Sequence, residues 1–188
     1  MTTGRQPSSC FTCGNRASCE WSALGDQEIA QLNGLKVSNV YQPGQVVLYQ
    51  GNPCLGIYCI RSGMVALRKT DPLGNSMLMR LAASGQTLGY RTFFSGGRYQ
   101  ASAEAITRSQ ICFLDRVGLG RLLDHNPELA RRFLQRLAED LRVAEEARMQ
   151  ATVLTVRARM AHLLLMLRER HATVTEEGSL VFDLPLSR

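Results

Sequence analysis

Histidine is scarce in this sequence of 188 residues, whose three histidines are His125, His162 and His171. No histidine lies between Met1 and Leu123, where most of the glycine-punctuated apolar runs occur. A small-molecule enzyme on a cupin-like β-roll would need a cluster of histidine and glutamate ligands on its strands. We therefore give this class of enzyme little weight and expect a protein without catalytic residues.

Long apolar runs are also missing. No stretch of about 18 apolar residues is present to span a bilayer, and the first twenty residues carry no apolar core of a secretory signal. The sequence thus predicts a cytoplasmic protein without membrane contact. A reducing cytoplasm disfavours structural disulfides, so the six cysteines need another explanation.

Acidic residues are outnumbered, with 16 Asp and Glu against 22 Lys and Arg, which gives a net charge of +6. Nearly all of the positive charge is arginine. Such an excess mildly favours contact with nucleic acid or another anion, but the charge is spread along the chain and also suits a solvated surface. The apolar fraction of 45% is that of an ordinary globular protein.

Three of the six cysteines, Cys10, Cys13 and Cys19, fall within ten residues at the spacing C-x2-C-x5-C. Thiolates this close in a glycine-bearing loop are typical ligands of a soft metal or of an iron–sulfur cluster. Three thiolates leave one coordination position open, so one of the remaining cysteines should complete the site. Structural zinc would use the same thiolates, and spacing alone leaves zinc and a cluster both open.

The segment after the cysteines predicts a short amphipathic helix over residues 24–32, followed by a β-rich region from Val37 to about Asp115. Short apolar runs alternate there with glycine turns, a pattern that favours an all-β barrel or jelly roll. Residues 71–75 have the composition of a hairpin turn. We expect strands at residues 46–49, 57–60, 64–68, 77–81, 101–106 and 110–114.

A long helix is expected from Pro127 to Leu154, with Asn126 as its N-cap. It would extend roughly 40 Å at 1.5 Å per residue, more than one small barrel can cover. Its narrow apolar stripe is flanked by charge, which favours a homodimer seam over packing on its own domain. The predicted interface residues are Leu134, Leu137, Leu141 and Ala144.

The end of the sequence predicts a second helix over residues 156–170, capped by Thr155, and then an alternating strand or hairpin over residues 173–184. Ser187 has the character of an N-cap for a helix that the sequence does not contain.

This order of parts resembles the CRP/FNR superfamily of bacterial transcription regulators. The β-roll motifs that carry the resemblance are Tyr41-Gln42-Pro43-Gly44-Gln45 with Gly51, and Ile57-Tyr58-Cys59-Ile60-Arg61-Ser62-Gly63. The resemblance implies an α+β fold: a cyclic-nucleotide-binding-like β jelly roll, a long dimerisation helix, and a short helix and strand leading toward a missing winged helix-turn-helix. The implied boundaries are 1–36 for the cysteine loop and short helix, 37–125 for the roll, 126–154 for the dimerisation helix and 155–188 for the truncated start of a DNA-binding domain.

The cysteines resemble those of the FNR branch, which hold an oxygen-labile [4Fe-4S] cluster. On this resemblance Cys10, Cys13, Cys19 and Cys112 are the cluster ligands, whereas Cys54 and Cys59 match no ligand position. We expect Cys59 to be a thiol packed in an apolar strand and Cys54 an exposed bystander in a turn. The implied partners are a second copy of the chain and, for the full-length protein, promoter DNA and RNA polymerase. The implied signal is oxygen, nitric oxide or another redox cue.

Two departures from the family pattern matter. Cyclic-nucleotide binders of the superfamily carry Gly-Glu at the ribose and Arg-Ser at the phosphate, where this chain has Gly89-Tyr90-Arg91 and Tyr99-Gln100-Ala101, with Arg98 one residue away. We therefore expect no cyclic nucleotide. Oxygen-gated relatives have an acidic side chain near the middle of the seam, where this chain has Ala144. A regulator of the same shape with structural zinc, or with another effector in the roll, is the alternative.

Overall fold

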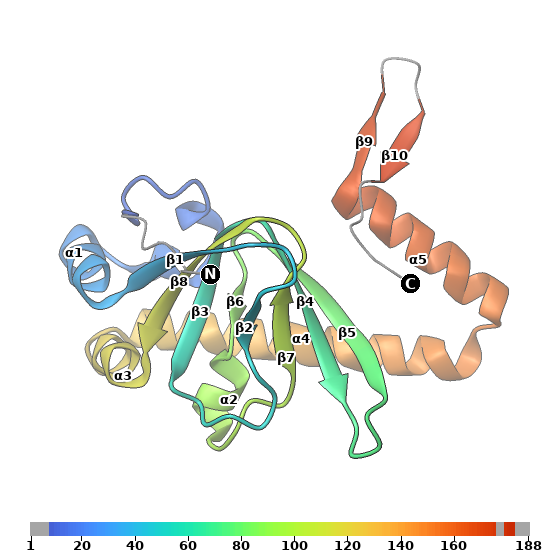
Figure 1. Ribbon diagram of the computed structural model, residues 1–188. Coiled ribbons are helices and arrows are strands. Elements are labelled where there is room, and N and C mark those ends of the chain that lie inside the picture. Colours follow the sequence, from blue (N-terminus) through green and yellow to red (C-terminus); the bar gives the residue numbers. More distant parts are fainter. Residues whose placement is uncertain (1–7, 176–178, 183–188) are drawn as a thin grey trace. The chain divides into compact units, whose positions relative to one another are not determined.

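The computed structural model describes residues 8–175 and 179–182 and divides into two compact units, residues 1–135 and 136–188 (Figure 1). The division falls within one long helix, α4 (Pro127–Val153), so each unit is described by itself. The expected N-cap Ser187 lies outside the described residues.

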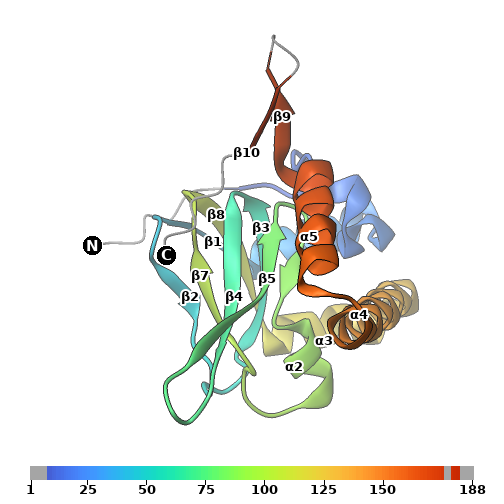
Figure 2. The ribbon, with the colours of Figure 1, turned by 90° about the vertical axis from the view of Figure 1, so that its right-hand side faces the viewer.

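Two four-stranded antiparallel sheets make up most of the first unit (Figures 1 and 2). The first sheet has the order β1 (Val37–Tyr41), β8 (Ser109–Asp115), β3 (Gly56–Ser62), β6 (Thr87–Leu88). The second has the order β2 (Val46–Leu48), β7 (Ser102–Ala105), β4 (Met64–Thr70), β5 (Ser76–Ala83). The predicted β-roll is therefore confirmed.

Apolar side chains from both sheets fill the space between them. Val65 is fully buried, and Ile60, Leu88 and Ile111 are at most 2% exposed. Strand residues alternate between two faces, so each strand places every second side chain in this core. The outer face of the first sheet is left for other elements to cover.

Three short helices belong to this unit: α1 (Asp26–Leu35), α2 (Tyr90–Ser95) and α3 (Arg116–His125). Helix α1 confirms the predicted amphipathic helix, since Ile29 and Leu32 are buried. The Glu28 carboxylate accepts a hydrogen bond from the backbone N–H of Gly25 at 2.8 Å, which closes the first turn.

The long helix α4 begins as predicted. The Asn126 side chain accepts a hydrogen bond from the N–H of Leu129 at 2.8 Å and so caps the helix. Within this fully described helix the buried residues are Leu129 and Phe133, both near its start. Leu134 and Leu141 are 62% and 60% exposed. Most of the predicted stripe is therefore exposed to solvent. None of the described helices is long and apolar enough to cross a bilayer.

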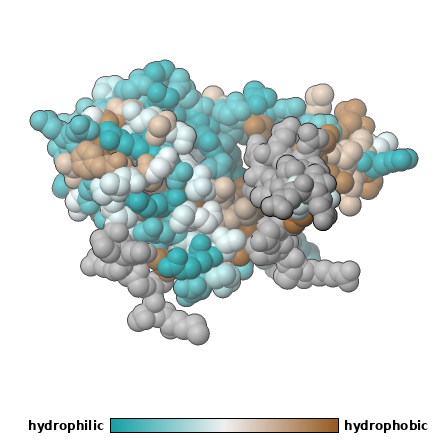
Figure 3. All heavy atoms as spheres, turned by 90° about the horizontal axis from the view of Figure 1, so that it is seen from above, coloured by the Kyte–Doolittle hydropathy of each residue, from teal (hydrophilic) through white to brown (hydrophobic). Residues whose placement is uncertain are grey.

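The second unit holds the rest of α4, helix α5 (Val156–His171) and the hairpin of β9 (Ala172–Val174) and β10 (Leu180–Phe182). Thr155 accepts a hydrogen bond from the N–H of Ala158 at 3.3 Å, as its predicted capping role requires. Hydrophobic side chains gather on the surface of this unit (Figure 3). The exposed ones on α5 are Val156, Met160, Leu164 and Leu165.

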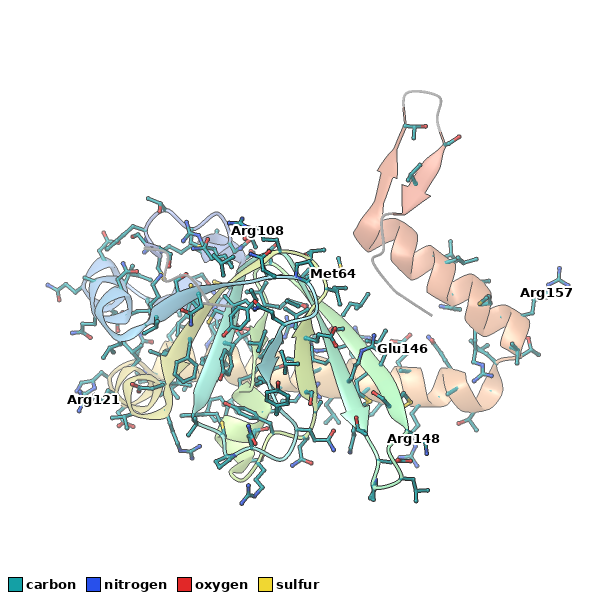
Figure 4. The ribbon with its side chains drawn as sticks, in the orientation of Figure 1. Met64, Arg108, Arg121, Glu146, Arg148 and Arg157 are labelled. Atoms are coloured by element: carbon teal, nitrogen blue, oxygen red, sulfur yellow. The ribbon has the colours of Figure 1, made fainter. Side chains whose placement is uncertain are left out.

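Charged side chains line the solvent face of α4 and pair along the helix. Arg142 contacts Glu139 at 2.7 Å and Glu146 at 3.2 Å, and Figure 4 shows Glu146 and Arg148 projecting from the same helix. Exposed pairs of this kind add little to the stability of a helix, because solvent screens the charges. Their main effect is to keep the charged face separate from the apolar stripe.

Four elements were not predicted: β1, β6, α2 and α3. Strand β6 has two residues and α2 only six, too short for periodicity to reveal. Helix α3 contains Gly118 and Gly120, which weaken a helical pattern. Gly118 lies against Leu114 and Leu35, so the close packing of α3 explains why glycine is present.

We predict that Gly63→Ala destabilises the roll by about 1–3 kcal/mol more than Gly74→Ala. Gly63 connects β3 to β4, and Gly74 lies in the β4–β5 hairpin turn. Both have positive φ, +94° and +89°, so both substitutions carry a similar backbone strain. A Cβ at Gly63 would come within 2.6 Å of the Ser109 Cα and 2.7 Å of the Arg108 carbonyl oxygen, whereas Gly74 faces open space. Denaturant unfolding measures the difference, and equal losses for the two variants would show that the turn at Gly63 is not tightly packed.

Candidate metal centre

The cysteine loop is folded by a series of tight turns. The N–H of Cys13 donates to the Cys10 carbonyl at 3.3 Å, and the N–H of Arg16 donates to the Cys13 carbonyl at 3.0 Å. Two short 3-10 helices follow, η1 (Arg16–Ser18) and η2 (Glu20–Ala23), with Cys19 between them. These turns bring the three N-terminal cysteines together, as their spacing predicted.

Hydrogen bonds dock this loop onto the roll. The Arg61 guanidinium, from β3, donates to the carbonyl oxygens of Ser9 at 2.8 Å and Thr12 at 3.4 Å. The side-chain amide of Asn15 donates a hydrogen bond to the backbone carbonyl of Arg61 at 2.8 Å. On the other side Asn33, from α1, accepts the N–H of Cys10 at 2.8 Å. The position of the loop is therefore set by the protein's own contacts with β3 and α1.

A hollow lies between the loop and the outer face of the first sheet. Besides thiols it is lined by the aromatic ring of Trp21, by the cations Lys36 and Arg61, and by apolar and small side chains. The structure brings all four predicted ligands to this hollow, together with a fifth thiol. The five are Cys10, Cys13, Cys19, Cys59 and Cys112.

The sheet contributes two of the five thiols. Cys112 on β8 and Cys59 on β3 are directly opposite each other in the antiparallel register. Side chains at directly opposed positions lie on the same face of a sheet. Cys59 therefore faces the hollow with Cys112, a placement that the sequence did not reveal because the strand register could not be read from it.

Cys54 lies elsewhere. It is 7% exposed and belongs to the core of the roll, where its thiol contacts the Gly56 carbonyl at 3.6 Å. It is thus buried rather than an exposed bystander, because the turn that carries it folds over the core. Cys54 is not among the residues that line the hollow, and that it is not a ligand stays a prediction.

Burial controls the charge of the thiols. It raises the pKa of Cys10, although the nearby Lys36 ammonium opposes the shift, and it raises the pKa of Cys19 to about 11. Burial also raises the pKa of Cys59 well above its usual range. Without a metal these thiols are neutral at pH 7, and binding of a cation would release their protons.

The arrangement of the thiols can be compared with that of a single-ion site. Four sulfurs around one zinc ion at 2.3 Å would lie only about 3.8 Å from one another. Among the described residues, no three His, Cys, Asp or Glu side chains form a group that could hold one metal ion. The cysteines line the hollow between the loop and the sheet. A donor set of thiols only is the set that iron–sulfur clusters use, so the residues fit such a group.

Trp21, which the sequence analysis did not single out, connects the hollow to α4. Its indole N–H donates to the Cys59 sulfur at 3.3 Å, and its ring meets Phe133 of α4 edge-on, with centroids 5.9 Å apart. Trp21 is 5% exposed and Phe133 is fully buried. Tyr90 and Phe94, from α2, pack on Phe133 as well. The only sequence signal was the position of the sole tryptophan two residues after Cys19.

A second connection runs through α1. The Glu28 carboxylate accepts a hydrogen bond from the Asn126 side-chain amide at 2.6 Å, and Asn126 caps α4. Leu32 of the same helix lines the hollow. The start of α4 is therefore tied both to the cysteine loop and to the helix beside it.

Arg98 and Tyr99 belong to the stretch that corresponds to the phosphate-binding segment of cyclic-nucleotide binders. Both side chains donate hydrogen bonds to backbone carbonyls of this chain. The Arg98 guanidinium donates to the Gly51 carbonyl at 2.8 Å. Tyr99 is 4% exposed, and its hydroxyl donates to the Gly56 carbonyl at 2.8 Å. Its ring packs against Tyr58 with centroids 6.4 Å apart. These side chains stabilise the loop that joins α2 to β7.

Several known proteins are similar to this chain in sequence or in fold. The family described as the cyclic nucleotide-binding domain matches residues 38–126. The chain is 29% identical over 182 residues to a probable transcriptional activator of Rhizobium leguminosarum bv. viciae, which covers 97% of this chain and 74% of that protein. It is 25% identical over 198 residues to the transcriptional activator protein FnrL of Cereibacter sphaeroides, covering 100% of this chain and 77% of that protein.

Among solved structures, the catabolite activator protein of Thermus thermophilus matches with a TM-score of 0.62 and 24% identity. The match covers 71% of this chain and 62% of that protein. This likeness shows the fold and agrees with the predicted fold class.

We predict that, in the metal-free protein, the rate of Cys19 alkylation keeps rising up to about pH 11, by about tenfold per pH unit. Only the thiolate reacts, and a pKa raised to about 11 leaves it a small fraction at lower pH. Peptide mass spectrometry after timed alkylation gives the rate at each pH. A rate that levels off near pH 8 or 9 would show that burial does not suppress the Cys19 thiolate.

Proposed function

We propose that the chain is a transcriptional regulator of the CRP/FNR superfamily. We infer that its thiol-lined hollow holds a [4Fe-4S] cluster, through which the regulator senses oxygen, nitric oxide or another redox signal. The proposed ligands are Cys10, Cys13, Cys19 and Cys112. The superfamily is one of regulators rather than enzymes, as the sequence predicted. A reducing cytoplasm, the location we propose, would keep the six cysteines free, as they are here.

One observation carries this proposal: thiols from two distant segments of the chain line one hollow. Cys112 is 93 positions beyond Cys19 (112 − 19) and yet lines the same hollow. Four cysteine ligands are what a [4Fe-4S] cluster requires. The strong metal ligands that line the hollow are all thiols, which is the donor set of an iron–sulfur cluster.

When bound, the cluster supplies iron and sulfide that oxygen or nitric oxide can attack. The protein's own residues would convert its presence into structure. Ligation by Cys10, Cys13 and Cys19 would add to the hydrogen bonds from Arg61 and Asn33 that hold the loop on the roll. Loss of the ligation would leave these few polar contacts as the main anchors, so the loop would be released more easily.

Movement of the loop would reach α4 through Trp21. The indole is only two residues from Cys19 and packs edge-on against the fully buried Phe133. Aromatic contacts of this geometry contribute about 0.5–1.5 kcal/mol beyond the area they bury. A shift of Trp21 would therefore disturb the start of α4, which couples occupancy of the hollow to the position of the helix.

We propose that α4 pairs with its copy in a homodimer. Its apolar stripe is open to solvent, with Leu134 62% and Leu141 60% exposed, and Leu137 partly buried between them. The charges that flank the stripe pair with one another along the same helix, as Arg136 does with Asp140 at 3.4 Å. Ala144 is small and exposed, whereas an acidic side chain at this position would repel its copy in the partner. Dimerisation should therefore depend less on the cluster than it does in oxygen-gated relatives with an acidic residue there.

In the full-length regulator, the dimer would bind promoter DNA and RNA polymerase. A dimer presents two recognition helices to half-sites about one DNA turn apart. The chain spans about three quarters of the length of the relatives described above. We propose the roll itself as a scaffold without a bound nucleotide, because Arg98 and Tyr99 are engaged with the backbone of neighbouring loops.

We predict that serine at Cys10, Cys13 or Cys19 abolishes most cluster binding. Each substitution removes a thiolate that the iron requires. The protein is loaded with iron and sulfide under anaerobic conditions, and its absorption and its iron and sulfide contents are measured. Cys54→Ser is the matched control, because Cys54 is a buried thiol of the core, and it should keep the brown colour.

A colourless Cys54→Ser protein beside a fully loaded Cys13→Ser protein would contradict this assignment of ligands. A colourless parent protein that carries zinc would instead identify the hollow as a structural zinc site.

We predict that Leu137→Glu converts the dimer into a monomer. Two carboxylates would face each other across the seam, where apolar side chains are expected to pack. Glu145→Leu, which removes a charge from the exposed part of the same helix, is the control and should leave the dimer intact. If sedimentation shows the same dimer for Leu137→Glu and the parent protein, the seam is not the interface.

A further inference from the structure

The two thiols on the sheet raise a question that the four-ligand site leaves open. The loop supplies three thiols, so a [4Fe-4S] cluster needs one more, and the sheet offers both Cys59 and Cys112. We propose, on the basis of the function inferred above, that Cys59 is an alternative fourth ligand, which can hold the cluster in place of Cys112.

Cys59 and Cys112 both face the loop, from neighbouring strands of the same sheet. Cys59 and Cys112 are direct neighbours across the β3–β8 ladder. Opposed residues of an antiparallel pair have Cβ atoms about 4.5–5.5 Å apart and point to the same face. Both side chains line the hollow together with Cys10, Cys13 and Cys19. Either sulfur could therefore serve as the fourth ligand beside the three thiols of the loop.

The contacts of Cys59 differ from those of a thiol that merely fills a core. Cys54 provides the comparison within the same chain: it packs in the core of the roll with Tyr99 and Val47. Among the described residues, that core cluster does not include Cys59. Cys59 lies instead on the opposite face of β3 from Ile60, which is part of the core.

A hydrogen-bond donor is aimed at the Cys59 sulfur. The Trp21 indole N–H lies 3.3 Å from it. Donors of this kind stabilise negative charge on sulfur and, around iron–sulfur clusters, help to set the reduction potential. Cys112 has a different neighbour, the Ser8 hydroxyl, at 3.6 Å from its sulfur. The two candidate ligands thus have distinct surroundings on one sheet face.

An exchange between the two ligands would have a structural consequence. Trp21 contacts both the Cys59 sulfur and Phe133 of α4. Ligation by Cys59 would place the cluster directly against the residue that connects the hollow to α4. Ligation by Cys112 would leave the Trp21–Cys59 hydrogen bond as it is. The site would then keep a cluster when either Cys59 or Cys112 is lost, because the other thiol can take its place.

The test compares Cys59→Ser, Cys112→Ser and the double variant Cys59→Ser/Cys112→Ser, each loaded with ferrous iron and sulfide under anaerobic conditions. We expect each single variant to keep at least about half of the parent's iron and sulfide, and the double variant less than about a tenth, because it alone lacks a fourth thiolate. Alanine versions of all three, checked by circular dichroism, separate loss of ligation from loss of folding.

A Cys112→Ser protein that folds but is as empty as the double variant, beside a fully loaded Cys59→Ser protein, would overturn this proposal and leave Cys112 as the unique fourth ligand. A double variant that keeps the parent's iron and sulfide would overturn it as well, since neither sheet thiol would then be needed. A parent chain that takes up no iron and sulfide would overturn the proposed function, and this proposal with it.

Discussion

The docking of the cysteine loop against the outer face of the first sheet is the constraint on which the rest of the site depends. The loop is held there by Arg61 from β3 and Asn33 from α1, through hydrogen bonds of 2.8 Å. Only in this position do Cys10, Cys13 and Cys19 face Cys59 and Cys112 across one hollow. The roll therefore acts as half of the site, and its outer face matters as much as its core.

The same docking explains how a site near the N-terminus can influence a helix more than a hundred residues away in the sequence. Trp21 and Phe133 form an aromatic junction between the end of the loop and the start of α4. Glu28 and Asn126 form a polar one beside it, at 2.6 Å. Beyond Phe133 most apolar side chains of α4 are exposed, Leu134 and Leu141 among them. Under the proposed function, a change at the hollow would reach the start of α4 through these two junctions.

Much of this arrangement follows from local sequence patterns, and the remainder depends on strand pairing. The spacing of three cysteines, the Asn126 cap and the apolar stripe of α4 are local, and they predicted the loop, the helix start and its exposed face. The placement of Cys59 at the hollow was not revealed because its partner across the sheet is 53 positions away (112 − 59), and only the register shows that the two share a face. Trp21 was missed for a similar reason, since Phe133 meets it only in the folded chain.

The most direct test of the cluster assignment is the iron and sulfide content of the unmodified protein, purified without oxygen. About four iron and four sulfide per chain, lost together on exposure to air, are expected if the hollow holds a [4Fe-4S] cluster. One zinc per chain without sulfide, or a protein that binds neither metal, would contradict it.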